Sequence, residues 1–357
     1  NPPGFYNSMS QLSGTAVDGN SLGVVDIVQY MVKRFSDSQY WTGSGDSWGG
    51  GTLLTVGASG FTPPDWSTSP AISWVHGEQY TVIVRPKDKA TNQPSEVAGG
   101  QVTFRYDTQK PTGYIANPSS TTATRYIRNL ASISGTASDD WSNSNKNVQV
   151  AIERLWDGRW FNEGTGNWSV YASTNWVNVT ELSSNATYWS YTHGSLNTAF
   201  GTNNTWYHIL VRSTDTATNV QSAFTLGISS WSFLYDNLAP NMTISYPGNN
   251  GRYRSSQVGG GANPFTGGAT DPNGSLGSGM DTVEVRLSYL LGADTYYWTG
   301  VLFASGSAVS GSGWRDTGNV TWEFTDNIVW RSADTEYTLE ARGEDKAVLG
   351  DGTGGGN

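Results

Sequence analysis

A thirteen-residue segment that occurs three times constrains the fold of this chain more than any other feature. It reads YTVIVRPKDKATN from Tyr80, YHILVRSTDTATN from Tyr207 and YTLEARGEDKAVL from Tyr337. The starts are 127 and 130 residues apart, so the chain holds three copies of one unit of roughly 125 residues. A fixed period identifies a repeat architecture, and the fold has to be sought within one unit.

The first five residues of each copy alternate between two faces. Tyr80, Val82 and Val84 share one face, and the same positions of the other copies are equally apolar. A period of two predicts a strand with one buried face. The Asp, Ala and Asn that follow favour a turn, because Asp and Asn side chains bond to their own backbone. The segment therefore predicts a strand followed by a hairpin turn.

Two further strands recur in each unit. The first ends in Ser13–Asp18, Ser134–Asp139 and Thr266–Asp271 and carries a glycine at the same place each time. Glycine inside a strand indicates that a backbone or a large side chain approaches closely. The second strand alternates cleanly through the apolar positions Val28, Tyr30 and Val32; Val148, Val150 and Ile152; and Val283, Val285 and Leu287.

Composition excludes several classes of protein. The 357 residues carry a net charge of −10, contain 44 Gly and no Cys, and hold no apolar run near the roughly 20 residues of a membrane helix. An all-β chain with no membrane insertion follows. Nucleic acid is excluded as a partner, because no clustered Lys or Arg could neutralise phosphates. Disulfides and thiolate metal sites are excluded, whereas the compartment is not fixed by the absence of Cys.

Seven Asn-x-Ser/Thr sequons make glycosylation a hypothesis, although a chain this rich in Asn, Ser and Thr produces about six by chance. The candidates are Asn167, Asn178, Asn185, Asn203, Asn241, Asn273 and Asn319.

Each of the first two units closes with an alternating strand and a short linker. Val102, Phe104 and Tyr106 precede Asp107-Thr-Gln-Lys-Pro111, and Trp231, Phe233 and Tyr235 precede Asp236-Asn-Leu-Ala-Pro240. Proline cannot donate to a strand ladder and stiffens the chain, so Asp-x-x-x-Pro predicts a taut linker. Linkers this short predict that neighbouring units touch.

Three motifs in a constant order resemble tandem bacterial immunoglobulin-like repeats of giant surface adhesins and extracellular fibres. They are Ser-Gly-Thr-Ala-x-Asp, Tyr-x-x-x-x-Arg-x-x-Asp-x-Ala-x-Asn and Tyr-Asp-x-x-x-Pro. The resemblance covers nearly the whole chain and implies three tandem immunoglobulin-like β-sandwich domains in an extended array. We expect them at residues 1–108, 109–238 and 239–357, called units 1, 2 and 3 below. Tyr80, Tyr207 and Tyr337 resemble the tyrosine that anchors the corner before strand F.

Unit 3 is expected to lack its own last strand, because too few residues follow Asp345. Either another subunit supplies that strand, as in donor-strand fibres, or the chain is an excerpt of a longer one, which is the interpretation favoured here.

The resemblance also implies a place for the aspartates. The loops after the second and sixth strands lie at the pole where the chain enters a unit, together with the linker. Carboxylates gathered there repel one another unless a cation binds, and oxygen-only clusters suit Ca²⁺, which family members bind at such junctions. The implied metal ligands are Asp107, Asp139, Asp140 and Asp215 for unit 2, Asp236, Asp271 and Asp345 for unit 3, and Asp18 and Asp88 for unit 1.

A purely structural alternative stands beside calcium. Asp-x-Ala-x-Asn can form an Asx-type turn, and Arg85, Arg212 and Arg342 can each pair with the Asp three residues on. In unit 3, Val348 and Leu349 replace the Thr and Asn of the other copies, which weakens a ligand role for that Asn.

Neither catalysis nor sugar binding has a strong signal. His76, His193 and His208 occupy unlike places in the repeat, and no shared Ser/His/Asp or paired-Glu arrangement exists, so no enzyme is expected. The 16 Trp are expected mainly in cores or subunit contacts. Exposed Trp or Tyr could instead stack on glycans. The best places to seek a specific interface are Trp156, Trp160, Trp168 and Trp176.

The sequence therefore predicts a non-enzymatic structural segment of an extracellular fibre, filament or adhesin stalk on a bacterial or archaeal cell surface, with junctions stiffened by Ca²⁺. Its partners would be copies of itself, the rest of a longer repeat chain, or glycans. The alternatives are a carbohydrate-binding module array and the accessory domains of a larger secreted enzyme.

Overall fold

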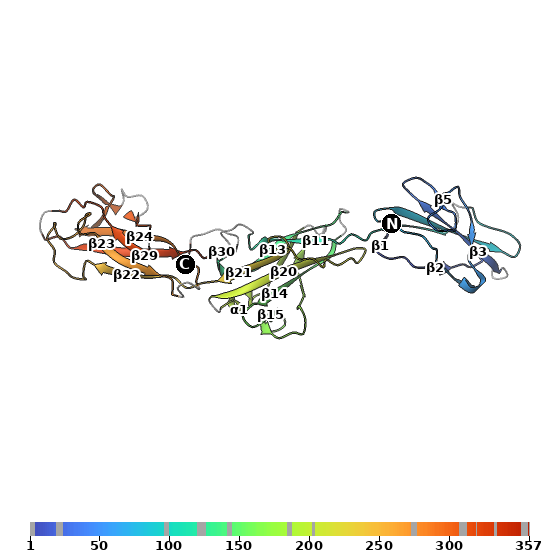
Figure 1. The fold of residues 1–357 in the computed structure, drawn as a ribbon, viewed down its shortest axis with the longest axis horizontal. Coiled ribbons are helices and arrows are strands. Elements are labelled where there is room, and N and C mark those ends of the chain that lie inside the picture. Colours follow the sequence, from blue (N-terminus) through green and yellow to red (C-terminus); the bar gives the residue numbers. More distant parts are fainter. Residues whose placement is uncertain are drawn as a thin grey trace.

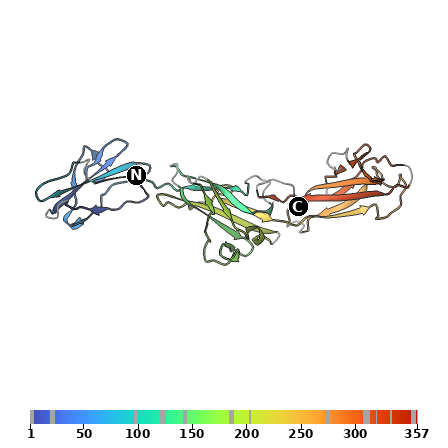
Figure 2. The same ribbon diagram turned by 180° about the vertical axis from the view of Figure 1, so that it is seen from behind.

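Three β-sandwiches follow one another along an extended array, as the two views of the computed structural model show (Figures 1 and 2). The fold is nearly all β, as expected. No helix in the described part of the chain has the length and apolar character to cross a membrane. The structure describes residues 4–18, 24–95, 100–119, 126–140, 145–183, 188–201, 204–272, 277–306, 313–318, 320–331, 334–350 and 356.

Unit 1 packs two antiparallel-rich sheets face to face. In pairing order the larger sheet contains β1 (Gly4–Tyr6), β10 (Gly100–Tyr106), β9 (Gln79–Asp88), β3 (Val25–Arg34), β4 (Tyr40–Trp41) and β5 (Trp48–Gly49), with β6 (Leu54–Thr55) beside β3. The smaller sheet contains β2 (Leu12–Thr15), β8 (Asp65–Thr68) and β7 (Phe61–Thr62), which follows the 3-10 turn η1 (Ala58–Gly60).

Unit 2 repeats the plan with a longer first sheet. That sheet contains β16 (Asn167–Ser169), β15 (Arg159–Asn162), β14 (Asn145–Arg154), β20 (Thr205–Asp215), β21 (Ser230–Tyr235), β12 (Tyr126–Asn129) and β30 (Val348–Leu349), with β17 (Val177–Asn178) beside β14. The second sheet contains β11 (Thr112–Asn117), β13 (Ser132–Ser138), β19 (Tyr188–Thr192) and β18 (Glu181–Leu182); the short α1 (Leu196–Ala199) follows β19.

Unit 3 has the same two layers. One sheet contains β22 (Asn241–Tyr246), β23 (Phe265–Thr270) and β28 (Thr321–Phe324). The other contains β26 (Phe303–Ser305), β25 (Asp294–Trp298), β24 (Met280–Leu291) and β27 (Arg315–Asp316), with β29 (Tyr337–Asp345) also paired to β24.

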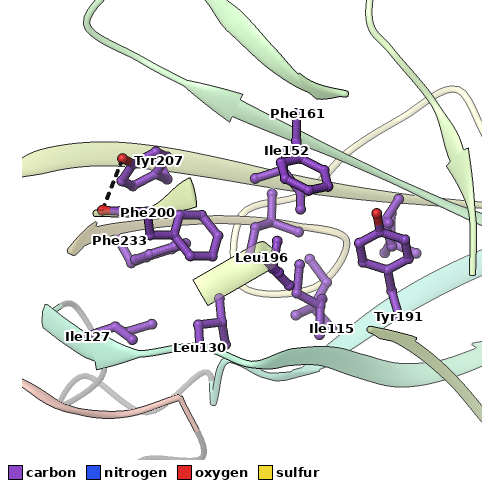
Figure 3. Packing of buried hydrophobic residues seen from close by; sticks show 14 of the residues in the cluster. Ile115, Ile127, Leu130, Ile152, Phe161, Tyr191, Leu196, Phe200, Tyr207 and Phe233 are labelled. Atoms are coloured by element: carbon purple, nitrogen blue, oxygen red, sulfur yellow. Dashed lines mark hydrogen bonds between the residues drawn. The ribbon is translucent and has the colours of Figure 1, made fainter. Parts of the chain in front are cut away.

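Buried apolar side chains form one cluster in each unit. The alternating strand predicted from Val28, Val148 and Val283 is β3, β14 and β24, and its inward side chains are buried in all three units. In unit 2, Leu196 of α1 and Phe200 lie between the two sheets, with Tyr207 and Phe233 beside them (Figure 3). The period-two pattern therefore identified the core face correctly.

The strand glycine makes room for a tryptophan in every unit, which confirms the expected close approach. Gly14, Gly135 and Gly267 lie against the indoles of Trp66, Trp189 and Trp322, which come from the paired strands β8, β19 and β28. All three indoles are buried. A Cβ on Gly14 would lie 3.0 Å from Trp66 Nε1, and one on Gly135 would lie 2.9 Å from Trp189 Cζ2.

The three corner tyrosines confirm the expected anchor. Val75 N donates to the Tyr80 hydroxyl at 3.1 Å, and Arg331 N donates to the Tyr337 hydroxyl at 3.0 Å. In unit 2 the Tyr207 hydroxyl donates to the Phe200 carbonyl oxygen at 3.4 Å (Figure 3). Each hydroxyl thus ties the start of its strand to the preceding loop.

Tyr80→Phe is expected to lower the free energy of unfolding of unit 1 by about 1 kcal/mol, because Val75 N loses its protein acceptor while the ring stays in place. Denaturant unfolding measures the change. Tyr188→Phe is the matched control, since Tyr188 is 49% exposed; its effect should stay below about 0.5 kcal/mol. Equal effects of the two variants would refute the anchoring role.

The last strand distinguishes unit 3 from the others. Strands β9 and β20 each lie between two neighbours, β3 and β10 in unit 1 and β14 and β21 in unit 2. Within the described residues, β29 pairs with β24 alone. The segment after β29 crosses to unit 2, where β30 runs parallel to β12. Gly350 N donates to Asn129 O at 3.0 Å, and Ser119 N donates to Gly350 O at 2.9 Å.

Candidate metal centre

The linker between units 1 and 2 begins with a fully buried aspartate. Asp107 follows the last residue of β10 and has no exposed surface. Its Oδ1 accepts a hydrogen bond from Gln109 N at 3.0 Å. Its Oδ2 is buried and has no hydrogen-bond partner among the residues that the structure describes. A buried carboxylate oxygen without a partner is costly, so this atom needs a proton or a cation.

Two more aspartates reach the same point from unit 2. Asp139 directly follows β13, and Asp215 is the last residue of β20 and is fully buried. Both strands end at the pole that faces unit 1, so their carboxylates converge on the linker. One oxygen from each of Asp107, Asp139 and Asp215 lies within 4.8 Å of the others. These three residues form the junction cluster.

Hydrogen bonds hold the junction cluster in place. Asn219 donates to Asp215 through its backbone N and its Nδ2, both at 2.7 Å, and also from Nδ2 to the Asp107 carbonyl oxygen at 2.9 Å. The turn of unit 2 is thereby fastened to the linker. These bonds form the Asx-type turn that the structural alternative predicted. The turn does not replace a cation site, because Asp107 Oδ2 still has no hydrogen-bond partner among the described residues.

The pairing of the repeat arginines with the aspartate three residues on is wrong. Arg85 Nε donates to Pro94 O at 2.9 Å, Arg212 Nε to Gln149 Oε1 at 2.8 Å and Arg342 Nε to Glu284 Oε2 at 2.7 Å. The arginine lies an odd number of residues from the aspartate, so its side chain leaves the opposite face of the strand.

Burial and repulsion between like charges both raise the pKa of Asp107 in the junction cluster. Desolvation, with Asp139, Asp215 and Asp140 nearby, raises the pKa of Asp107 from 3.8 to about 6. Burial also raises the pKa of Asp215, although the hydrogen bonds from Asn219 oppose that shift. Without a counter-charge the ionised cluster is therefore destabilising near neutral pH.

His76 is a junction residue that the sequence reasoning missed. Its Nδ1 accepts a hydrogen bond from Thr108 N at 3.1 Å, so Nε2 carries the proton and donates to Asp140 Oδ2 at 2.9 Å. The ring joins the loop before β9 of unit 1 to the loop after β13 of unit 2. One atom each of His76, Asp107 and Asp140 also lies within 4.8 Å of the others. Its position four residues before Tyr80, in the corner that faces the linker, was the available signal.

The junction between units 2 and 3 buries the corresponding aspartates. Asp236 and Asp345 have no exposed surface, and Asp271 is 7% exposed. Asp236 Oδ2 accepts from Ser278 N at 2.8 Å and Asp271 Oδ2 from Gly279 N at 2.7 Å. Asp345 lies opposite Met280 in the β24–β29 ladder. All three therefore gather around residues 278–280, and a metal role for them stays a prediction.

The aspartates of unit 1 have ordinary surroundings. Asp88 is half-buried and accepts from Asn92 N at 2.7 Å and Asn92 Nδ2 at 2.8 Å, which lowers the pKa of its carboxyl. Asp18 is also half-buried and follows β2. Their proposed partner would lie before unit 1, and their metal role stays a prediction.

Three sequons fall on described residues, and all three asparagines are exposed: Asn167 on β16, Asn178 on β17 and Asn241 on β22. Asn185, Asn203, Asn273 and Asn319 lie outside the described residues. Glycosylation stays a prediction at every one.

A serine, a histidine and a glutamate line up across unit 2. His208 Nε2 lies 2.7 Å from Ser230 Oγ, and His208 Nδ1 lies 3.8 Å from Glu153 Oε2. Burial lowers the pKa of His208. Ser230 is only 7% exposed, so its hydroxyl is not open to a substrate. The three residues lie on adjacent strands as a cross-strand ladder that stabilises the sheet.

Most described tryptophans lie in the cores or pack on arginines. Trp176 lies under Arg212, with 4.3 Å between the guanidinium carbon and the ring centroid, and Trp314 has the same relation to Arg342 at 4.4 Å. Trp156 is 67% exposed and stands beside Arg154 at a hairpin tip. A sugar platform needs several exposed coplanar rings, and these tryptophans supply no such row.

Comparison with known proteins adds structural similarity only. No protein-family model matches the sequence, and no curated protein does. A solved Ca²⁺-stabilised adhesin with which an Antarctic bacterium binds ice is similar with 13% identity and a TM-score of 0.25, covering 93% of this chain and 68% of that one. A 1.5-MDa bacterial ice-binding adhesin is similar with 13% identity and a TM-score of 0.30, covering 93% of this chain and 89% of that one. The FN1–FN3 domains of chicken CNTN1 are similar with 11% identity and a TM-score of 0.29, covering 100% of this chain and 96% of that one. Similarities this low support no conclusion about function.

Proposed function

We propose that this chain is a structural segment of an extracellular cell-surface fibre, filament or adhesin stalk, and that Ca²⁺ at the junction cluster fixes unit 2 against unit 1. The observation that carries the proposal is Asp107 Oδ2, a buried carboxylate oxygen with no hydrogen-bond partner among the described residues, on a residue that has one carboxylate oxygen within 4.8 Å of an oxygen of Asp139 and of Asp215. The three carboxylates of the junction cluster match the oxygen ligands of Ca²⁺.

The bound ion would neutralise the negative charge of the junction cluster and connect the linker that leaves unit 1 to two loops of unit 2. Asp107 belongs to the linker that leaves unit 1, whereas Asp139 and Asp215 belong to two loops of unit 2. Bending at the junction would separate these ligands. Direct contacts between units 1 and 2 restrict the same motion: Asn7 Nδ2 donates to Thr218 Oγ1 at 3.4 Å and His76 Nε2 to Asp140 Oδ2 at 2.9 Å. A mechanical role follows from a junction that resists bending.

Calcium addition to the chelated full chain is expected to raise its unfolding temperature and narrow the range of distances between units 1 and 2. Calorimetry measures the unfolding temperature. Pulsed electron–electron double resonance between spin labels on units 1 and 2 measures the distance distribution. Asp139→Asn is expected to weaken calcium binding at least tenfold, because it removes one charged ligand. Asp65→Asn is the matched control, because Asp65 is exposed on β8 of unit 1 and belongs to none of the candidate metal sites; it should leave the calcium response of units 1 and 2 unchanged. If calcium changes neither stability nor the distance distribution, the proposal for this junction is wrong.

A further inference from the structure

We propose that the junction between units 1 and 2 holds a second cation site beside the junction cluster, in which His76, Asp107 and Asp140 bind Zn²⁺. The imidazole belongs to the corner loop before β9 of unit 1, and Asp140 belongs to the loop after β13 of unit 2. This ion would therefore tie the two sandwiches to each other. Its charge balance rests on the proposed calcium site, whereas its ligand geometry does not.

Three ligand atoms of suitable kinds converge at this point. One nitrogen of His76 and one oxygen each of Asp107 and Asp140 lie within 4.8 Å of one another. His76 Nε2 lies 2.9 Å from Asp140 Oδ2, and His76 Nδ1 lies 3.4 Å from Asp107 Oδ1. An imidazole together with carboxylates suits Zn²⁺, whereas oxygen ligands alone suit Ca²⁺. The donor set therefore differs in kind from that of the junction cluster.

The ring of His76 is held in an orientation that suits a metal ligand. Thr108 N donates to Nδ1 at 3.1 Å, which directs Nε2 at Asp140 Oδ2. In the cation-free protein, the Nε2 proton lies between the ring and this carboxylate. Zinc binding at Nε2 needs the proton on Nδ1, where Asp107 Oδ1 accepts it in place of the bond from Thr108 N. Histidines that bind metals typically donate their other ring nitrogen to a carboxylate or a carbonyl in this way.

The site is open to solvent on one side and buried on the other. The side chains of His76 and Asp140 are 37% and 33% exposed, so an ion can enter. Asp107 has no exposed surface, and its Oδ2 has no hydrogen-bond partner among the residues that the structure describes. Such an oxygen costs free energy unless a proton or a cation compensates it. An ion bound to His76 and Asp140 would lie next to this carboxylate.

One divalent cation does not balance the charge of this junction. Asp139, Asp140 and Asp215 lie close enough to Asp107 for their negative charges to act on it. The proposed Ca²⁺ compensates two of the four carboxylates, and a second divalent cation compensates the other two. Since buried uncompensated charge is costly, both ions stabilise the junction. Asp107 belongs to both groups of three ligands and would bridge the two ions.

The junction between units 2 and 3 differs at both of the added ligands. His76 stands four residues before the corner tyrosine, and the same position of unit 2 is Asn203. Asp140 directly follows the aspartate that ends the glycine strand, and the same position of unit 3 is Pro272. The imidazole and the second carboxylate thus occur together at one junction and are replaced together at the other. This pairing is expected of two residues that bind the same ion.

The test measures zinc binding to the chelated full chain by titration calorimetry, before and after saturation with Ca²⁺. Zinc is expected to bind under both conditions. With calcium present it should further narrow the distribution of distances between spin labels on units 1 and 2. His76→Gln is expected to weaken zinc binding by about tenfold or more, because it removes the ring nitrogen, and to leave the calcium response intact.

His193→Gln is the matched control. His193 lies in the loop after β19, where its Nδ1 accepts from Ser195 N at 3.2 Å, and it belongs to neither group of ligands. Its substitution should leave zinc binding unchanged. Asp140→Asn provides a second variant with the same expected loss of zinc binding as His76→Gln.

Three results would overturn the zinc site: no zinc binding by the parent chain, equal zinc binding by the parent and His76→Gln chains, or displacement of calcium by zinc, which would mean a single shared site. A normal calcium response in the first two cases leaves the proposed calcium site standing. Zinc binding without any calcium response has the opposite meaning, since the zinc ligands would then hold while the calcium site fails.

Discussion

Gly135→Ala is expected to lower the free energy of unfolding of unit 2 by about 3 kcal/mol or more. The added Cβ would overlap the backbone carbonyl oxygen of Tyr114 on β11 and would lie 2.9 Å from Trp189 Cζ2 on β19. Neither neighbour can move away cheaply. Tyr114 belongs to the β11–β13 ladder, and Trp189 is fully buried with its Nε1 donating to Thr136 O at 2.9 Å.

Gly14→Ala is the matched control at the same repeat position. Its Cβ would meet only the Trp66 indole, 3.0 Å from Nε1, with no backbone atom among its nearest neighbours. A side chain can shift by a few tenths of an ångström, so a loss of about 1 kcal/mol is expected. Gly267→Ala should resemble Gly135→Ala, because its Cβ would overlap Thr243 O. Calorimetric unfolding of the three variants measures the order, and equal losses at Gly14 and Gly135 would contradict the role of the adjacent backbone.

The sequence predicted the elements that local periodicity encodes. Strict alternation identified β3, β14 and β24 and their buried face, and the repeated glycine predicted a close approach that proved to be an indole. Tyr80, Tyr207 and Tyr337 were predictable as anchors because each begins the repeated segment, where the resemblance implied a corner tyrosine. Each of these features depends on residues near in sequence or fixed by the repeat.

Long-range pairing could not be predicted in the same way. Nothing in Val348-Leu349 signals a parallel ladder with β12, some 220 residues earlier in the chain. Two residues carry no usable period, and the choice of partner depends on how units 2 and 3 approach each other. The actual partners of Arg212 and Arg342 were likewise invisible, because they lie across the sheet on β14 and β24.

The candidate site was predictable in outline and incomplete in detail. The linker position of Asp107 and the strand-end positions of Asp139 and Asp215 follow from sandwich topology, and the structure brings the three together. His76 was not found because the histidines do not recur between units. Topology places loops at a common pole, whereas a side chain that crosses from one unit to the next depends on the tilt between them.

The raised pKa of Asp107 makes the stability of the cation-free junction depend on pH in a defined direction. Since its pKa rises from 3.8 to about 6, the folded state binds this proton more tightly than the unfolded state. The free energy of unfolding should therefore fall as pH rises from about 4 to about 7. With each pKa unit worth about 1.4 kcal/mol, the loss is on the order of 2 to 3 kcal/mol. Bound calcium should reverse the trend, because protons then compete with the ion.

Asp107→Asn is accordingly expected to stabilise the chelated protein at pH 7 by about 2 kcal/mol, while weakening its calcium response. The amide keeps an oxygen for Gln109 N and removes the charge that Asp139 and Asp215 repel. Asp88→Asn should act in the opposite direction, because hydrogen bonds from Asn92 stabilise that ionised carboxyl. Calorimetry of both variants, with and without calcium between pH 4 and pH 7, measures these opposite changes in stability. A chelated Asp107→Asn protein less stable than the parent at pH 7 would show that the buried charge is already compensated within the protein and that the cluster has no need of an ion.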